Sequence, residues 1–166
     1  MIDNANYVGE YLARSKSSEH RLLYVSPSLT QDLHISGIPQ ISIRLASSKP
    51  AANLSVWLVS LPWNGSEDAP IFDNIITRGW ADPQNQKSTS ESAPLVPGQF
   101  YTVNFDLQPD DQVIPAGQQI GLMIFSSDQE FTLHPEPGTE LLVDLRSTRL
   151  SIPVVGGQEA FKSAIE

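Results

Sequence analysis

Cysteine is absent from this chain of 166 residues. The sequence therefore has no disulfide, no cysteine nucleophile and no zinc–sulfur site. No stretch approaches the roughly 20 consecutive apolar residues of a membrane helix, so we expect no membrane partner. The N-terminal segment also lacks the apolar core of a signal peptide, and the signal of a secreted protein would have to lie outside this sequence. The compartment stays open, because a cysteine-free domain suits the cytoplasm and the exterior equally.

Basic residues are scarce. Ten Lys and Arg stand against nineteen Asp and Glu, which gives a formal net charge of −9 at pH 7. An acidic surface repels phosphate groups, so we expect no nucleic-acid partner. The 40% hydrophobic and 17% charged residues are typical of a globular protein rather than a disordered one. A chain of this length can form one domain that needs neither a disulfide nor a metal for stability.

The sequence also lacks a recognisable catalytic motif. A serine hydrolase of the α/β class needs Gly-x-Ser-x-Gly at a sharp strand-to-helix turn, and no such pentapeptide occurs. The nearest approach, Asn64-Gly65-Ser66-Glu67, lies in a polar loop and lacks the second glycine. The three histidines have structural explanations. His20 lies in a linker-like segment, His34 alternates with apolar neighbours and should face out, and His134 precedes a proline at a strand end. We expect this chain to be inactive on its own.

Metal-binding patterns are weak as well. Asp110, Asp111, Asp128 and Glu130 flank one predicted strand, so a calcium ion could bind where those turns meet. Their spacing does not match the Asp-x-Asp-x-Asp-Gly loop, and Asp pairs in turns usually bond their own backbone. We favour the turn role and predict no metal and no cofactor.

Turn residues and short alternating segments are what the sequence does contain. Its thirteen Pro and ten Gly separate about nine short apolar segments, with no strong helix between them. The predicted strands cover residues 21–26, 32–36, 40–46, 54–61, 75–81, 100–107, 119–126, 140–145 and 149–154. This pattern predicts an all-β, antiparallel sandwich. Periodicity alone does not separate a jelly roll from an immunoglobulin-like sandwich, although the lack of a Cys-Trp-Cys pattern disfavours the latter.

The same pattern predicts the core and the domain limits. Residues 54–61 are apolar on both faces, which favours a central strand with Trp57 inside. Seven alternating residues should point between the two sheets: Val56, Leu58, Val103, Phe105, Leu122, Ile124 and Val143. We interpret residues 1–20 as an interdomain linker that lies on the domain or stays loose. The domain spans residues 21–157, and residues 158–166 form a C-terminal tail with a possible short helix.

Three stretches carry a family resemblance. The first runs from Pro109 to Asp128, with polar turn residues followed by an alternating strand; we interpret its first half as turn. The second is Arg21-Leu-Leu-Tyr-Val-Ser-Pro-Ser-Leu-Thr, which leads into Leu33-His-Ile-Ser-Gly, and the third is Ile76-Thr-Arg-Gly-Trp-Ala-Asp-Pro. Together they resemble the C-terminal β-sandwich domain of bacterial Xaa-Pro dipeptidyl-peptidases and their cocaine-esterase-like relatives. The resemblance covers the chain from about Arg21 to Gly157 and implies a jelly roll of the galactose-binding-like kind.

The resemblance also implies a function. In that family a separate α/β-hydrolase domain carries a Ser-Asp-His triad and releases N-terminal X-Pro dipeptides, while the sandwich packs on that domain and helps wall the approach to the active site. By this likeness, the chain is a non-catalytic accessory domain of a bacterial hydrolase, cytoplasmic or secreted, with the catalytic domain as its partner in cis or in trans. Sugar-binding jelly rolls stack aromatic rings on pyranoses, so the alternative is an independent carbohydrate-binding module with surface tryptophans.

One candidate contact surface lies in the loop of residues 64–74. Trp63 precedes this loop, and Ile71 and Phe72 lie within it. Apolar side chains in a loop either fold back on their own domain or meet another one. We expect the second, with Ile71 and Phe72 exposed or the loop poorly ordered in the isolated domain.

A second candidate surface is the segment around Arg78 and Trp80. Arg78 and Asp82 could pair across one strand face on either side of Trp80. We expect this segment to organise the fold or to pack against the catalytic domain.

Overall fold

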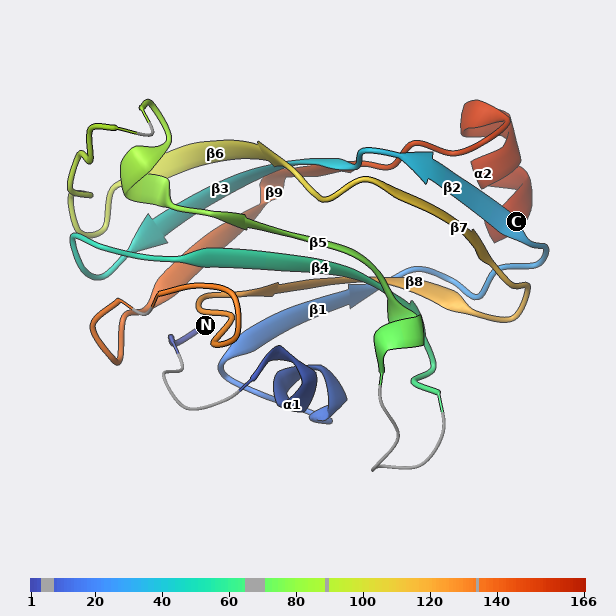
Figure 1. The fold of residues 1–166 in the computed structure, drawn as a ribbon, viewed down its shortest axis with the longest axis horizontal. Coiled ribbons are helices and arrows are strands. Elements are labelled where there is room, and N and C mark those ends of the chain that lie inside the picture. The colour runs from blue at the N-terminus through green and yellow to red at the C-terminus, as the bar shows by residue number, and fades with distance from the viewer. Residues whose placement is uncertain (4–7, 65–70, 89, 134) are drawn as a thin grey trace.

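Two layers of antiparallel strands enclose the core (Figure 1). The computed structural model describes residues 1–3, 8–64, 71–88, 90–133 and 135–166. One sheet has the order β1 (Arg21–Val25), β8 (Gln119–Phe125), β4 (Leu54–Leu61) and β5 (Ile75–Ala81). The other layer contains the sheet β6 (Phe100–Asp106), β3 (Gln40–Ser47), β9 (Leu141–Ser151) and the pair β2 (Leu33–Gly37) and β7 (Asp110–Ile114). The all-β, antiparallel jelly-roll sandwich that the sequence predicts is confirmed.

Short helices complete the described part of the fold. They are α1 (Gly9–Arg14), the 3₁₀ turns η1 (Phe72–Asn74) and η2 (Pro83–Asn85), and α2 (Gly157–Ile165). Helix α2 lies beside β2 at one end of the sandwich, where the Thr30 N–H donates to the Ala164 carbonyl at 2.7 Å (Figure 1). A possible short helix was predicted in the C-terminal tail, and α2 occupies that segment.

The main core lies between the two layers. Every residue of β4 is buried, which confirms the predicted central strand. Four of the seven predicted core residues are buried there: Val56, Leu58, Val103 and Ile124. The other three, Phe105, Leu122 and Val143, pack against the core while half-buried. The strand-facing assignment from alternation therefore holds, although three positions lie nearer the rim than expected.

A second core covers the outer face of the four-stranded sheet. Trp57, which is 2% exposed, points to this side together with Met123 and Phe125. Helix α1 lies beneath it in Figure 1 and buries Leu12 and Ala13 against these residues. A Cβ at Gly9 would approach the Trp57 ring to 2.3 Å, so only glycine permits this close packing. The segment interpreted as a linker thus contributes a helix to the domain.

Two strands differ from the sequence prediction. Residues Asp110–Ile114 form β7, although the first half of the stretch from Pro109 was interpreted as turn. This polar segment pairs with β2, with Leu33 opposite Ile114, so long-range pairing overrides its local turn character. The two strands predicted at residues 140–145 and 149–154 are one strand, β9, which continues through a shift of register opposite Ser42 and Arg44. A bulge lets the chain stay in one sheet while extra residues loop out.

Candidate functional site

A buried carboxylate joins two tryptophans at the end of β8. Asp128 follows this strand and is completely buried. Its Oδ2 accepts hydrogen bonds from the indole N–H of Trp57 on β4 at 3.0 Å and of Trp80 on β5 at 3.1 Å. Both tryptophans lie on the outer face of the sheet, so the carboxylate links side chains from two neighbouring strands to the segment that follows a third.

The electrostatic environment of Asp128 is unfavourable to its charge. Burial raises the pKa of the Asp128 carboxyl, while the hydrogen bonds from Trp80 and Trp57 and the charge of Arg78 act in the opposite direction. Its second oxygen, Oδ1, is buried without a hydrogen-bond partner among the described residues. The hydrogen bonds from the two indoles offset part of this desolvation cost.

Arg78 binds aromatic faces. Its Cζ lies 4.6 Å from the centre of the Phe131 ring and 5.5 Å from that of Trp57. The suggested pairing with Asp82 is wrong: no ion pair links the two side chains, and Asp82 instead accepts from the Gln84 N–H at 3.0 Å. Residues 128–133 carry Phe131 over Arg78, so a contact distant in sequence displaces the local one.

An apolar patch lies next to Arg78 and Asp128. It consists of Trp80, Phe131 and Leu133, and we call it the Trp80 patch. The rings of Trp80 and Phe131 stack with their centroids 5.1 Å apart. Phe131 is 49% exposed and Leu133 is 90% exposed. A recess of about 270 Å³ runs beside Trp80 and Leu133, with Asn53, Asp82 and Thr132 on its polar side.

The turn that presents the patch is firmly held. The Asp128 carbonyl accepts from the N–H groups of Phe131 at 2.9 Å and Thr132 at 2.8 Å. The Thr132 hydroxyl accepts from the Asp128 N–H at 3.0 Å, and the Asn53 side chain donates to the Leu133 carbonyl. These bonds keep Leu133 pointing outward instead of allowing it to collapse onto the domain.

The other three predicted site residues lie at the opposite end of β5. Trp63 is half-buried against the second core, and Ile71 is completely buried in it, so the expected exposure of Ile71 is wrong. Phe72, in contrast, is 65% exposed, as expected. The Asn74 side chain holds this end by donating to Ser60 O at 2.8 Å and accepting from the Asn64 N–H at 2.8 Å. Residues 65–70, and with them Gly65, Ser66 and Glu67, lie outside the described residues.

The candidate catalytic and metal-binding groups stay apart. Among described residues there is no group of three or more His, Asp or Glu that could hold a metal ion. His34 Nε2 lies 2.5 Å from Oδ1 of the exposed Asp111, and His20 places Nδ1 3.0 Å from the Ile2 carbonyl. His134 lies outside the described residues. In the described part of the chain, no helix is long and apolar enough to cross a membrane.

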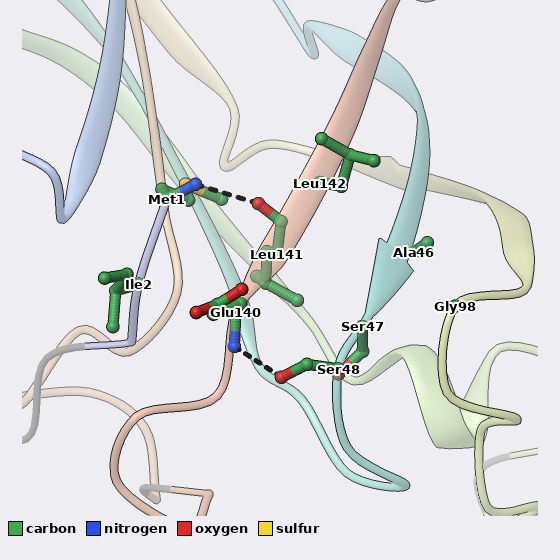
Figure 2. Close-up of a pocket in the computed structure, with 9 residues that line it drawn as sticks. All are labelled: Met1, Ile2, Ala46, Ser47, Ser48, Gly98, Glu140, Leu141 and Leu142. Carbon is green, nitrogen blue, oxygen red and sulfur yellow. Dashed lines mark hydrogen bonds between the residues drawn. The ribbon is translucent and has the colours of Figure 1, made fainter.

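A second recess, of about 420 Å³, lies where the N-terminus meets β9 (Figure 2). The Met1 amino group donates to the Leu141 carbonyl at 2.8 Å, and the Glu140 N–H donates to the Ser48 hydroxyl at 2.8 Å. Apolar side chains and backbone line most of it, and Glu140 is its one ionisable side chain among the residues drawn. Met1 and Ile2 form part of the wall of this recess.

The described tryptophans do not form the open platform that a carbohydrate-binding module would need. Trp57 is buried, and both Trp63 and Trp80 are half-buried. Asp128, Phe131 and Leu133 are the site residues that the sequence analysis missed in this role. In the sequence these residues are visible only as a polar turn after the alternating strand. Their role could not be predicted from it, because the bonds from Asp128 to Trp57 and Trp80 span 71 and 48 residues.

The chain resembles known proteins over almost its whole length. Residues 2–162 match the family described as "X-Pro dipeptidyl-peptidase C-terminal non-catalytic domain". Two relatives, both named "Putative Xaa-Pro dipeptidyl-peptidase", come from Rhodopirellula baltica and Bacillus anthracis. The first is 64% identical to this chain, and the match covers 95% of this chain and 25% of the relative. The second is 38% identical, and the match covers 93% of this chain and 25% of the relative. The chain thus spans about a quarter of these relatives. A solved aminopeptidase from a Thaumarchaeota archaeon shares the fold, with a TM-score of 0.70 at 15% identity over 93% of this chain and 28% of that one.

Proposed function

Since this chain belongs to the family of X-Pro dipeptidyl-peptidase C-terminal non-catalytic domains, we propose that it is the accessory domain of a serine hydrolase. In this proposal it packs on an α/β-hydrolase catalytic domain of the same polypeptide and shapes access to the active site. The parent enzyme would release X-Pro dipeptides from peptide N-termini. The match over residues 2–162 is the observation that carries the proposal.

The length of the relatives supports this assignment. The chain corresponds to 25% of the Rhodopirellula baltica relative, so three quarters of that protein remain for other domains. The absence of a nucleophile elbow from this sequence fits a division of labour in which the chemistry lies elsewhere. A domain of this kind acts through positioning, because a lid or wall beside an active site selects which substrates reach it.

A chimera tests the proposed function. The quarter of the Rhodopirellula baltica relative that this chain matches is replaced by this chain, and X-Pro p-nitroanilide hydrolysis is compared with the intact relative and with the relative truncated before that quarter. We expect the chimera to retain activity within about tenfold of the intact relative and the truncated form to lose it, with the isolated chain inactive. A fully active truncated form would contradict the proposal, as would turnover by the isolated chain that a serine-directed phosphonate abolishes.

A further inference from the structure

We infer that the Trp80 patch is the surface through which this domain docks on the hydrolase domain of its own polypeptide. The inference rests on the proposed function and names the contact that it requires. The candidates from sequence lie at the two ends of β5, and the structure distinguishes them. At the Phe72 end, Ile71 is buried and Trp63 is half-buried in this domain's own core. Of the three candidate residues at that end, Phe72 alone is exposed. At the Trp80 end, both Phe131 and Leu133 are exposed beside the half-buried Trp80.

The patch has the composition of an interaction hot spot. Aromatic residues and arginine dominate binding energy at interfaces, particularly when they are fixed before binding. Trp80 is fixed by its bond to Asp128, Phe131 by stacking on Trp80, and Arg78 by lying over Phe131. Leu133, 90% exposed on a hydrogen-bonded turn, adds an aliphatic side chain that packs on almost nothing in this domain.

The position of residues 1–3 supports the hydrolase domain as the partner of the Trp80 patch. The Asp3 N–H donates to the Thr139 carbonyl at 2.7 Å, and the Asp3 carboxylate accepts from the Ser127 hydroxyl at 2.7 Å. Asp3 therefore bonds to both ends of the segment that carries Phe131 and Leu133, and Figure 1 shows the N-terminus beside that segment. In a parent enzyme whose catalytic domain precedes this one, the polypeptide would arrive next to the segment that carries Phe131 and Leu133, whereas η1, which contains Phe72, lies at the opposite end of β5.

Charge around the patch specifies the chemistry of its partner. Asp82 and Glu130 are exposed at its edge, and the chain as a whole carries a net charge of −9. Arg78 is already engaged with two aromatic rings. The complementary surface on the hydrolase domain is therefore an apolar recess that accepts Leu133 and Phe131 and is flanked by Lys or Arg.

Hydrogen exchange tests the docking surface. Exchange is compared between the isolated chain and the same chain within the chimera described above, with Leu133→Asp and a matched control, Leu142→Asp, in each. Leu142 is also exposed, at 64%, but lies on β9 beside the recess of Figure 2. We expect peptides covering residues 129–133 to exchange at least tenfold more slowly in the chimera, Leu133→Asp to abolish that protection, and Leu142→Asp to leave it unchanged.

Each other outcome separates the two proposals. Protection of residues 71–74 without residues 129–133 would overturn this surface while leaving the accessory role intact. Protection of neither segment, with no other surface affected, would overturn both. A dimer of the isolated chain that Leu133→Asp dissociates would assign the patch to a second copy and overturn the inference.

Discussion

The bond between Asp128 and the two indoles leads to a prediction that isolates one interaction. Replacing Asp128 with Asn keeps an oxygen that can accept from Trp57 and Trp80, whereas replacing it with Leu removes the acceptor. Both variants lack the buried charge, so the desolvation penalty of the carboxylate cancels when they are compared. The difference in their free energies of unfolding therefore reports mainly on the acceptor, together with the amide N–H groups of Asn and the apolar burial of Leu.

The structure sets the size of that difference. The Trp57 N–H is buried, so losing its partner costs about 1 to 3 kcal/mol. Trp80 is half-buried, so water can partly replace its partner, and its loss costs about 1 kcal/mol or less. We expect the Asp128→Leu variant to be less stable than Asp128→Asn by about 1 to 4 kcal/mol at pH 7.

A pH series adds a second test with a defined sign. The ordinary pKa of the carboxyl is 3.8, and burial raises the pKa of Asp128 in the folded state. The folded protein therefore holds this proton more tightly than the unfolded chain does. Its stabilising effect is fully present below the ordinary pKa and is lost as the pH rises through the raised value. The stability of wild type minus that of Asp128→Asn should fall as the pH rises above 3.8 and level off above the raised pKa of the folded state.

Urea unfolding, followed by tryptophan fluorescence and circular dichroism, measures both quantities. Equal m-values for the two variants would show that they unfold from comparable native states. A stability difference below about 0.5 kcal/mol between Leu and Asn would refute the reasoning, because it would mean that the indoles find other partners at no cost. A wild-type advantage that grows with pH would contradict the direction of the pKa shift.

Three further predictions concern packing and activity. Gly9→Val should destabilise the domain by about 1 to 3 kcal/mol, because a Cβ would lie 2.3 Å from the Trp57 ring. Urea unfolding followed by fluorescence should show this loss together with a red shift of the Trp57 emission, and an unchanged unfolding midpoint would contradict this packing. Leu58→Ala, in the same assay, should cost about 3 kcal/mol, and Phe105→Ala clearly less, since Leu58 is completely buried and Phe105 is half-buried; the reverse order would show that the facing assignment is wrong. The isolated chain should not cleave X-Pro p-nitroanilide above background, and stoichiometric labelling of one serine by a phosphonate would contradict this.

Alternation allowed most strands to be predicted, and its limits are physical. Residues 54–61 are apolar on both faces, and β4 is indeed covered on both. The polar segment of β7 shows no alternation of apolar residues. Its backbone pairing with β2 holds it in the sheet instead. Helix α1 is six residues long, too short to be stable by propensity, and it lies where Gly9 fits against Trp57. Gly9 and Trp57 are far apart in the sequence, so no local pattern predicts their contact.

The candidate site was likewise predicted only in part: residues with a local sequence pattern were found, and their distant partners were not. Arg78 and Trp80 stood out because an aromatic flanked by charges on a strand is visible in sequence. Their true partners were not visible, because Asp128 and Phe131 come from a turn about 50 residues away. The predicted pairing of Arg78 with Asp82 is wrong for this reason. The two residues are four positions apart and Asp82 lies just beyond the end of β5, while the Arg78 guanidinium lies over the Phe131 ring, 4.6 Å from its centre.

The energetics of Leu133 argue that the Trp80 patch serves more than folding. A side chain that is 90% exposed gains almost nothing from the hydrophobic effect in this domain, yet a network of hydrogen bonds fixes the turn that displays it. Asp128 bonds Trp80 through its carboxylate and the backbone of the Leu133 turn through its carbonyl, so one buried residue supports both parts of the patch. Stability and docking should then separate in a specific way. Leu133→Asp should abolish docking without lowering the stability of the isolated domain, whereas Asp128→Leu should reduce both, because it removes the support beneath the surface as well as an acceptor within the fold.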